Sequence, residues 1–102
     1  MLVVLWQFQV REEHCAEFER LYGAEGAWAK LFRQDPAYVR TELFRHAERP
    51  GVYLSMDRWY SRAAYARFRA DHAAAYQALD DLGEQLTESE ALVGMLETSE
   101  TG

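Results

Sequence analysis

The sequence predicts a single α+β domain whose elements follow the order strand, helix, strand, strand, helix, strand. Apolar residues alternate along three short segments, which is typical of β-strands with one buried face. After the first and the third of these segments, apolar residues recur at every third or fourth position, which is typical of helices. The chain has 102 residues, the usual length of one domain with one core.

The first half of the chain contains a predicted strand and a predicted helix. Residues 2–10, LVVLWQFQV, are rich in valine and aromatic residues and predict the first strand. The period then changes, since Phe18 and Tyr22 follow helical spacing and the segment WAKLF at residues 28–32 resumes it. Gly23 and Gly26 interrupt this pattern. We therefore expect a long helix that is broken or kinked there and ends before Pro36.

The second half repeats the pattern with an additional strand. Residues 38–46, YVRTELFRH, and 52–60, VYLSMDRWY, flank the turn AERPG and predict a β-hairpin. Ser61 is a good N-cap for a second helix, whose apolar stripe runs from Tyr65 to Leu86. The segment TESE at residues 87–90 predicts a turn or small capping box, and residues 91–98 predict a weaker last strand. We expect one domain over residues 1–98 and a flexible acidic tail over 99–102.

This order is that of the ferredoxin-like βαββαβ arrangement, an antiparallel sheet with both helices on one face. Because side chains alternate between the faces of a strand, parity predicts which residues lie under the helices. That face is expected to be almost wholly apolar: Leu2, Val4, Trp6, Phe8, Val10, Val39, Thr41, Leu43, Val52, Leu54 and Met56. The other face is mixed: Gln7, Gln9, Tyr38, Arg40, Glu42, Phe44, Tyr53, Ser55, Asp57 and Trp59. Since a face with so many aromatic residues is rarely left bare, we expect a homodimer formed sheet against sheet.

Composition and charge exclude several classes of protein. The net charge is −6, so the chain lacks the basic excess that nucleic-acid binding requires. The single cysteine, Cys15, cannot form an intrachain disulfide, and residues 2–10 are too short to span a membrane and lack a basic leader. We therefore expect a cytoplasmic protein with no membrane or nucleic-acid partner. The three histidines show no metal-ligand spacing, so no metal site is predicted.

Four segments of the chain resemble a known family: VLWQFQV, FERLYGAEGAWAKLF, YLSMDRWYSRAAYARF and YQALDDLGEQLTESEALVG. They are similar to the small antibiotic-biosynthesis-monooxygenase-like proteins of the dimeric α/β-barrel superfamily, over about residues 3–94. The resemblance implies the same fold and dimer. In some members it also implies oxidation of electron-rich phenols or anthrones by molecular oxygen, with no metal or flavin. Other members open haem or isomerise lactones, and many small ones have no established activity.

The resemblance also implies a set of site residues. In the oxidising and haem-opening members, a polar residue of the first strand, often asparagine, acts with a tryptophan after the third strand and a histidine or tyrosine of the second helix. Trp59 matches the tryptophan. His72 lies on the second helix, a few residues past the usual histidine position, which falls near Phe68 and Arg69. The chain contains no asparagine, and Gln7 is the nearest polar candidate.

The candidate catalytic residues are His72 and Tyr65, which would manage a proton. An imidazole titrates near neutral pH, so His72 could deprotonate a phenol and leave a phenolate that gives an electron to oxygen. Trp59 would position a flat ligand. Three more residues are candidates to line an apolar pocket for it: Trp6, Trp28 and Phe32. Each has a structural alternative, because aromatic side chains fill cores and a helix histidine is usually hydrogen-bonded to backbone.

Two acidic residues of the predicted hairpin, Asp57 and Glu42, are expected to form salt bridges with Arg40 or Arg58 at the dimer interface.

Three functional hypotheses remain. The first is a cofactor-independent monooxygenase that acts on a small aromatic or phenolic compound. The second is a module that binds a small ligand in the same cavity without turnover. The third is a structural protein with a filled core. The missing asparagine argues against the first and does not bear on the other two.

Overall fold

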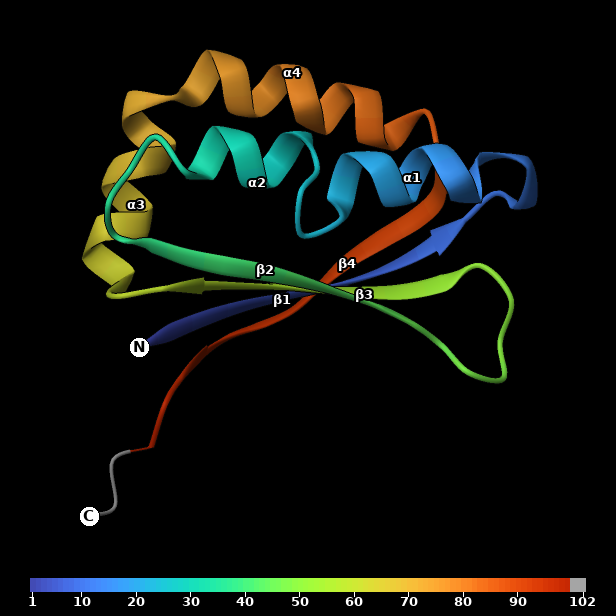
Figure 1. The fold of residues 1–102 in the computed structure, drawn as a ribbon, viewed down its shortest axis with the longest axis horizontal. Helices are drawn as coiled ribbons and strands as arrows, with labels where there is room; N and C mark the ends of the chain where they lie inside the picture. Colours follow the sequence, from blue (N-terminus) through green and yellow to red (C-terminus); the bar gives the residue numbers. More distant parts are fainter. Residues whose placement is uncertain (100–102) are drawn as a thin grey trace.

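The computed structural model describes residues 1–99 and shows one antiparallel sheet with the helices packed on one of its faces (Figure 1). The elements are β1 (Leu2–Val10), η1 (Glu12–His14), α1 (Cys15–Tyr22), α2 (Ala27–Phe32), β2 (Tyr38–Arg45), β3 (Val52–Trp59), α3 (Arg62–Asp71), α4 (Ala73–Glu84) and β4 (Thr87–Glu97). The strand order is β2-β3-β1-β4, and each neighbouring pair is antiparallel. This confirms the predicted ferredoxin-like arrangement. Residues 100–102 of the predicted tail lie outside the described residues.

The first predicted helix is divided, as expected, into α1 and α2. Gly23 has an extended backbone with φ −69° and ψ 172°, which ends α1. Gly26 is buried where the chain turns back, and a Cβ atom there would lie 2.5 Å from the backbone oxygen of Leu21. Glycine is therefore required at position 26 by a close approach of backbone to backbone.

The second predicted helix is also divided, which the apolar stripe did not predict. Ser61 caps α3 as expected, since its Oγ accepts a hydrogen bond from the N–H of Ala64 at 3.1 Å. The break is at His72, where φ is −119° and ψ is 30°. Helical hydrogen bonds continue on both sides, from the His72 N–H to the Phe68 oxygen and from the Tyr76 N–H to the His72 oxygen. The apolar residues of α3 and α4 therefore continue at helical spacing across the break, so the sequence pattern shows no interruption.

The last strand begins earlier than predicted. β4 starts at Thr87, so the TESE segment is strand and not a turn or capping box. Glu90 lies opposite Phe8 in the register of β1 and β4. The turn is completed by the hydrogen bond from the Leu86 N–H to the Gly83 oxygen, so the next residue already pairs with β1.

The parity predicted for the third strand is wrong. In the register of β1 and β3, Trp6 lies opposite Ser55 and Val4 lies opposite Asp57, and opposed residues share a face. The helix-facing residues of β3 are therefore Tyr53, Ser55, Asp57 and Trp59, while Val52, Leu54, Met56 and Arg58 lie on the open face. Tyr38 also lies on the helix side and is buried, because an irregularity in the β2–β3 register lies between Tyr38 and Arg40.

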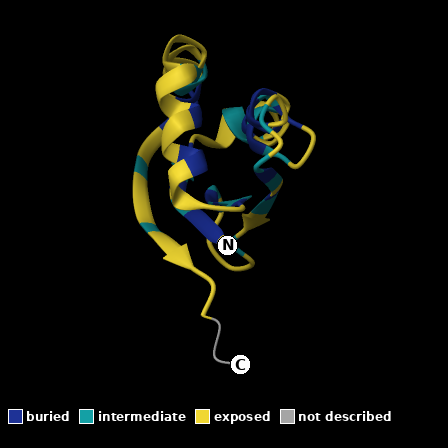
Figure 2. Cartoon of the chain, turned by 90° about the vertical axis from the view of Figure 1, so that its left-hand side faces the viewer, coloured by how far each residue is buried: buried dark blue, intermediate teal, exposed yellow. Residues whose placement is uncertain are grey.

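Aromatic residues fill the space between the helices and the sheet. Figure 2 shows the buried residues on the inward sides of these two layers. Phe18, Phe68 and Trp59 are completely buried. The Phe32 ring lies 5.4 Å from the Trp59 ring and 5.5 Å from the Phe68 ring, both in edge-on geometry. None of the helices within residues 1–99 is long and apolar enough to cross a membrane.

Replacing the buried glycine of α4 is expected to destabilise the protein. A Cβ atom at Gly83 would overlap the hydroxyl of Tyr22, which is itself buried. The better helix propensity of alanine favours Gly83→Ala by about 1 kcal/mol, but overpacking costs about 1–3 kcal/mol. We expect a net loss of stability in urea unfolding. Gly94→Ala is the control, because its Cβ would meet nothing closer than Leu96 at 3.7 Å. A gain in stability from Gly83→Ala would contradict this packing.

Candidate active-site pocket

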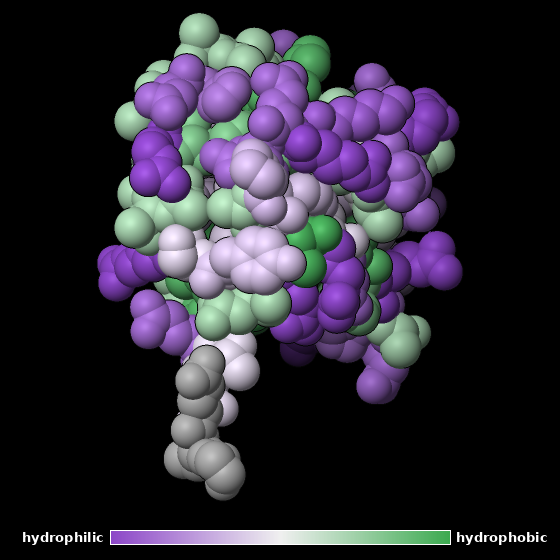
Figure 3. Space-filling model, turned by 60° about the vertical axis from the view of Figure 1, so that its left-hand side comes forward, coloured by the Kyte–Doolittle hydropathy of each residue, from purple (hydrophilic) through white to green (hydrophobic). Residues whose placement is uncertain are grey.

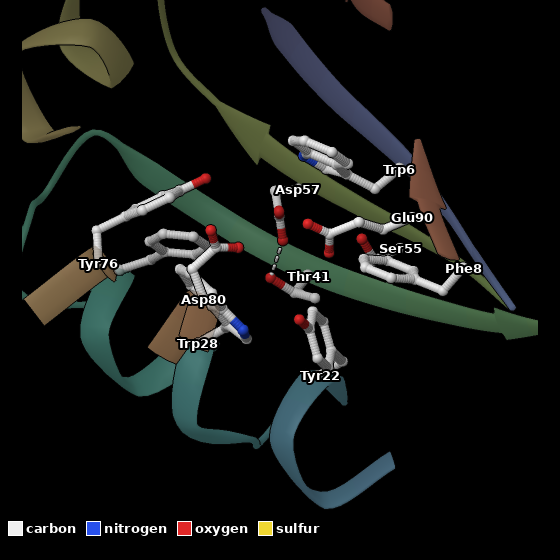
Figure 4. Close-up of a pocket in the computed structure, with 11 residues that line it drawn as sticks. Trp6, Phe8, Tyr22, Trp28, Thr41, Ser55, Asp57, Tyr76, Asp80 and Glu90 are labelled. Atoms are coloured by element: carbon white, nitrogen blue, oxygen red, sulfur yellow. Dashed lines mark hydrogen bonds between the residues drawn. The ribbon is translucent and has the colours of Figure 1, made fainter. Parts of the chain in front are cut away.

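A pocket opens between the helices and the sheet (Figure 4). The space between its walls is about 420 Å³ when the open solvent at its mouth is included. Its walls are mainly aromatic, and its lining is Trp6, Phe8, Tyr22, Trp28, Phe32, Thr41, Ser55, Asp57, Tyr76, Asp80 and Glu90. The side chains leave little of this space free, enough for roughly two waters. The pocket is therefore a narrow slot that its aromatic walls nearly fill.

A chain of hydrogen bonds leads to Asp57 in this pocket. The Thr41 hydroxyl donates to Oδ1 of Asp57 at 2.5 Å, a short charge-assisted bond. Because Thr41 has one hydroxyl proton and gives it to the carboxylate, it accepts the proton of the Tyr38 hydroxyl, 2.7 Å away. Two neighbouring strands supply this relay, since Thr41 lies directly opposite Asp57 in the register of β2 and β3.

Burial of Asp57 raises the pKa of its carboxyl group from 3.8 to about 6, and the hydrogen bond from Thr41 opposes part of this rise. Protein surrounds the carboxylate of Asp57. Another part of the residue faces the empty space of the pocket, so Asp57 as a whole is half-buried. No ion pair within 4.0 Å includes Asp57 among the described residues. Asp57 is therefore an acid that can gain or lose a proton near neutral pH.

Three further carboxylates gather beside the pocket. Asp80 and Glu84 lie on α4 and Glu90 lies on β4, and their oxygens are within 4.8 Å of one another. Asp80 and Glu90 also line the pocket. Burial raises the pKa of Glu90, and the charges of Asp80 and Glu84 raise it further.

The structure separates the predicted site residues into two groups. Trp6, Trp28 and Phe32 lie on the pocket wall. Trp59 is fully buried behind Phe32 and does not line the pocket, and its indole N–H has no hydrogen-bond partner among the described residues. Gln7 is exposed and lies opposite Leu54, on the face of the sheet away from the helices.

The two predicted catalytic residues lie elsewhere. The His72 ring stacks on Phe68 with 4.2 Å between centroids, and its Nδ1 is 3.2 Å from the Phe68 backbone oxygen. Tyr65 is buried and borders a separate open groove that is also lined by Arg69 of α3 and Met95 of β4. The structure therefore does not bring His72 or Tyr65 to the pocket that holds Asp57.

The charged residues of the hairpin are also separated. Glu42 lies on the open face and pairs with Arg40 at 3.1 Å and Arg58 at 3.3 Å, as the sequence suggested for this acid. The expectation that Asp57 would form a salt bridge on the same face is wrong, because β3 turns Asp57 toward the helices. An aspartate inside a strand rich in aromatic residues was the feature of the sequence that pointed to Asp57. The prediction placed this residue on the wrong face of the sheet because it assigned the alternating residues of β3 to the wrong sides.

Comparison with solved structures supports the fold. SnoaB from Streptomyces nogalater, a cofactor-independent oxygenase, matches with a TM-score of 0.76 and 22% identity over 98% of this chain and 94% of that chain. A Deinococcus radiodurans protein assigned to the antibiotic biosynthesis monooxygenases matches with a TM-score of 0.80 and 18% identity, over 99% and 95% of the two chains. A Caulobacter crescentus protein with the same assignment gives 0.74 and 17%, over 97% and 90%. At these identities the likeness establishes the fold alone.

Comparison of the sequence is more specific. No protein with a curated description matches this chain. The family model described as antibiotic biosynthesis monooxygenase matches residues 1–89, which is most of the chain. The protein therefore belongs to the antibiotic biosynthesis monooxygenase family.

Proposed function

We propose that this protein is a cofactor-independent monooxygenase that oxidises a small phenolic compound with molecular oxygen in the pocket above β3. Membership of the family supports the class of reaction. The observation that carries the proposal is Asp57, an acid with a pKa of about 6 in a narrow aromatic pocket. Such a group can accept the proton of a phenol at neutral pH and return it later.

The chemistry needs a base and oxygen. Asp57 takes the phenol proton, and the phenolate then gives one electron to O2. The resulting phenoxyl radical and superoxide join through a C–O bond at the ring carbon para to the oxygen. The proton held by Asp57 returns to the outer peroxide oxygen, the O–O bond breaks as the para C–H proton leaves, and water departs. One phenol and one O2 thus give one quinone and one water.

The chain's own residues would orient the substrate in this scheme. Trp6 and Phe8 of β1 and Trp28 of α2 present rings to the slot, which favours a flat ring between them. The hydroxyl pair of Tyr38 and Thr41 holds the Asp57 carboxylate in place. In this proposal Thr41 is a positioning residue, and Asp57 is the group that meets the substrate.

We also propose that the protein acts as a homodimer through the open face of the sheet. This face carries Leu54 and Met56 of β3 and the half-exposed Phe44 of β2, close to the Glu42 ion pairs. On β4 the exposed Leu96 lies on the same face, opposite Val3, whereas the exposed Leu92 and Met95 lie opposite Trp6 and Val4, on the helix side of the sheet. The open face therefore combines apolar side chains with ion pairs, as interfaces between protein chains commonly do. Figure 3 shows a different side of the molecule, its left-hand end in Figure 1, where hydrophobic and hydrophilic side chains are interspersed.

A module that binds the ligand without turnover is the second candidate, because the same aromatic walls would hold a flat ring whether or not it reacts. An oxygen electrode separates the two candidates. Phenols with a free para position are added to the protein, and oxygen uptake is compared with binding measured by quenching of tryptophan fluorescence. We expect at least one phenol to bind and to consume oxygen. Binding without uptake by any phenol would favour the binding module.

Because Thr41 is hydrogen-bonded to Asp57, we expect a substitution at Thr41 to shift the pH dependence of kcat/KM. Thr41→Val removes the hydrogen bond that stabilises the Asp57 carboxylate, so the pKa of Asp57 rises further. Because the base acts when deprotonated, the rise of kcat/KM with pH should move upward by about one unit. Thr41→Ser keeps the hydroxyl and should restore the original profile. An unchanged profile in Thr41→Val would show that Asp57 does not set it.

A further inference from the structure

Helix α4 is far less buried than the other long helices. Among its 12 residues, Ala73–Glu84, the buried one is Gly83, which has no side chain to anchor the helix. By contrast, α2 buries four of its six residues, and α1 and α3 each bury two aromatic side chains. Segments with little buried apolar surface open at a lower free energy than the rest of a protein. We therefore expect α4 to separate from the domain more easily than the other helices.

Both ends of α4 are fixed to the rest of the protein. At the first end, the backbone of His72 breaks the helix, and its ring stacks on the completely buried Phe68 with 4.2 Å between centroids. At the other end Leu86 is buried, and its backbone oxygen accepts a hydrogen bond from the Arg11 N–H at 3.1 Å. Movement of α4 is therefore confined to the helix between these two points.

Helix α4 forms one wall of the pocket that holds Asp57. Tyr76 and Asp80 line this pocket from α4, as Figure 4 shows, and the Tyr76 ring lies edge-on to Trp28 of α2 at 4.8 Å. With α4 in this position the free space holds roughly two waters, which is less than the ring of a phenol needs. A ring can therefore enter only if a wall moves, and α4 is the least anchored wall.

A contact between α3 and α4 holds the helix in this position. Cζ of Arg69, in the last turn of α3, lies 4.3 Å from the centroid of the Tyr76 ring, in the first turn of α4. A guanidinium over the face of a ring is attracted by it. This contact therefore fastens the two helices to each other across the break at His72.

Like charges oppose the closed position farther along α4. The carboxylate oxygens of Asp80 and Glu84 on α4 and of Glu90 on β4 lie within 4.8 Å of one another. No ion pair within 4.0 Å in the described part of the chain includes any of these three acids. Charges of one sign repel at this spacing. When the cluster is ionised, limited packing therefore holds α4 closed against a repulsion from β4.

We propose that α4 is a lid: it separates from α2 and β4 between His72 and Leu86, admits a flat ring to the pocket and closes over it. The lid rests on the packing of α4, and only the identity of the ring, a phenol, rests on the proposed function. An isolated helix of 12 residues is marginal in water. Helix α4 should therefore unwind in part when it separates, and its amides should then exchange with solvent.

Hydrogen exchange of the full-length protein tests whether α4 opens on its own. Amide exchange is followed by NMR at neutral pH, without urea and in low concentrations of urea. We expect the amides of α4 to be protected about 100-fold less than those of α1, α2 and β1, relative to their intrinsic rates. Their exchange should depend little on urea, because the opening exposes little surface. Equal protection and equal urea dependence in all four elements would mean that α4 opens only on global unfolding, and would overturn the proposal.

Two substitutions should shift the lid in opposite directions. Arg69→Gln removes the guanidinium from the Tyr76 ring, so exchange within α4 should become about threefold faster. Glu90→Gln removes one charge from the repelling cluster, so exchange within α4 should become slower by about the same factor. Exchange in β1 should stay unchanged in both variants, which shows that the effect is local.

Each of these variants has a matched control. Arg67→Gln removes another exposed arginine of α3, which is in no ion pair within 4.0 Å among residues 1–99. It should leave exchange within α4 unchanged. Asp81→Asn removes an exposed carboxylate of α4 that accepts a hydrogen bond from Gln77 outside the acidic cluster. It should not slow exchange within α4.

The rate of ligand entry tests whether the opening serves the pocket. The flat phenol 2-naphthol is mixed rapidly with the protein, and binding is followed by quenching of tryptophan fluorescence. Because only the open fraction admits the ring, association should be about threefold faster in Arg69→Gln and slower in Glu90→Gln, in step with exchange within α4. Association rates that stay the same in both variants, or a failure of 2-naphthol to bind, would overturn the proposal.

Oxygen uptake keeps this outcome separate from the proposed function. If exchange and association change together but no phenol consumes oxygen, the lid stands and the oxygenase fails. If a phenol is oxidised while α4 opens only on global unfolding, the lid fails and the oxygenase stands.

Discussion

Asp57→Asn is expected to reduce kcat/KM for phenol oxidation by about 10²–10⁴-fold, the usual contribution of a general base. Asparagine has nearly the same shape as aspartate and can still accept the hydrogen bond from Thr41, so the pocket should remain intact. Ligand affinity should change much less than the rate. Steady-state oxygen uptake and fluorescence binding on the same samples measure the two effects. Asp81→Asn serves as the control for a lost surface carboxylate.

The same variant should change how stability depends on pH. The folded-state pKa of Asp57 is about 6 and its ordinary value is 3.8, so the folded protein binds the proton more tightly than the unfolded chain. This contribution is present below pH 4 and is lost as the pH rises from about 4 to 6. The loss amounts to about 3 kcal/mol at most, from a shift of about two units. Asp57→Asn should therefore be more stable than the parent above pH 6.

Urea unfolding from pH 4 to pH 8 measures this difference. The parent should lose stability with rising pH more steeply than Asp57→Asn, with a smaller slope left in both from Glu90, whose pKa is also raised. Parallel curves for the two proteins would mean that Asp57 is solvated and unsuited to the role of base.

If the protein forms the proposed dimer, Leu54→Arg is expected to convert it into a monomer. Leu54 lies on the open face of β3, opposite Gln7 of β1 and Phe44 of β2, where the partner's sheet would cover it. An unpaired charge at the centre of such an interface commonly costs several kcal/mol, which separates subunits at micromolar concentration. Sedimentation equilibrium measures the change in mass.

Leu82→Arg is the matched control for the dimer. Leu82 is 51% exposed on α4, on the helix layer and away from the open face of the sheet. It should leave the dimer intact. A parent protein that is monomeric at micromolar concentration, or a dimer disrupted by Leu82→Arg alone, would contradict an interface on the sheet face.

The sequence predicted the order of the elements because each has a local cause. Ser61 caps its helix and Gly26 permits a close backbone approach, and both effects are visible without the tertiary structure. The break at His72 left no such signal, because the helical hydrogen bonds on either side preserve the phase of the stripe. The early start of β4 at Thr87 depends on pairing with β1, which is a tertiary interaction.

The site was harder to predict than the fold. Three of the expected pocket residues, Trp6, Trp28 and Phe32, lie on its wall, since large aromatic residues belong in this layer. Asp57 was assigned to the other face because Val52, Leu54 and Met56 make the more apolar half of their strand. The strand register overrides that preference, because burying Tyr53 and Trp59 places far more apolar surface in the core. A one-residue difference in register moves every side chain to the other face, so this error hid the acid.

Labelled oxygen tests the central claim most directly. The protein is incubated with a phenol that it binds, under ¹⁸O2, and the product is analysed by mass spectrometry beside an Asp57→Asn sample. We predict that the quinone carries one ¹⁸O atom, that one O2 is consumed for each quinone formed, and that the variant forms almost none. A product without label, or equal product from the parent and Asp57→Asn, would contradict the assignment of this pocket as an oxygenase site with Asp57 as its base.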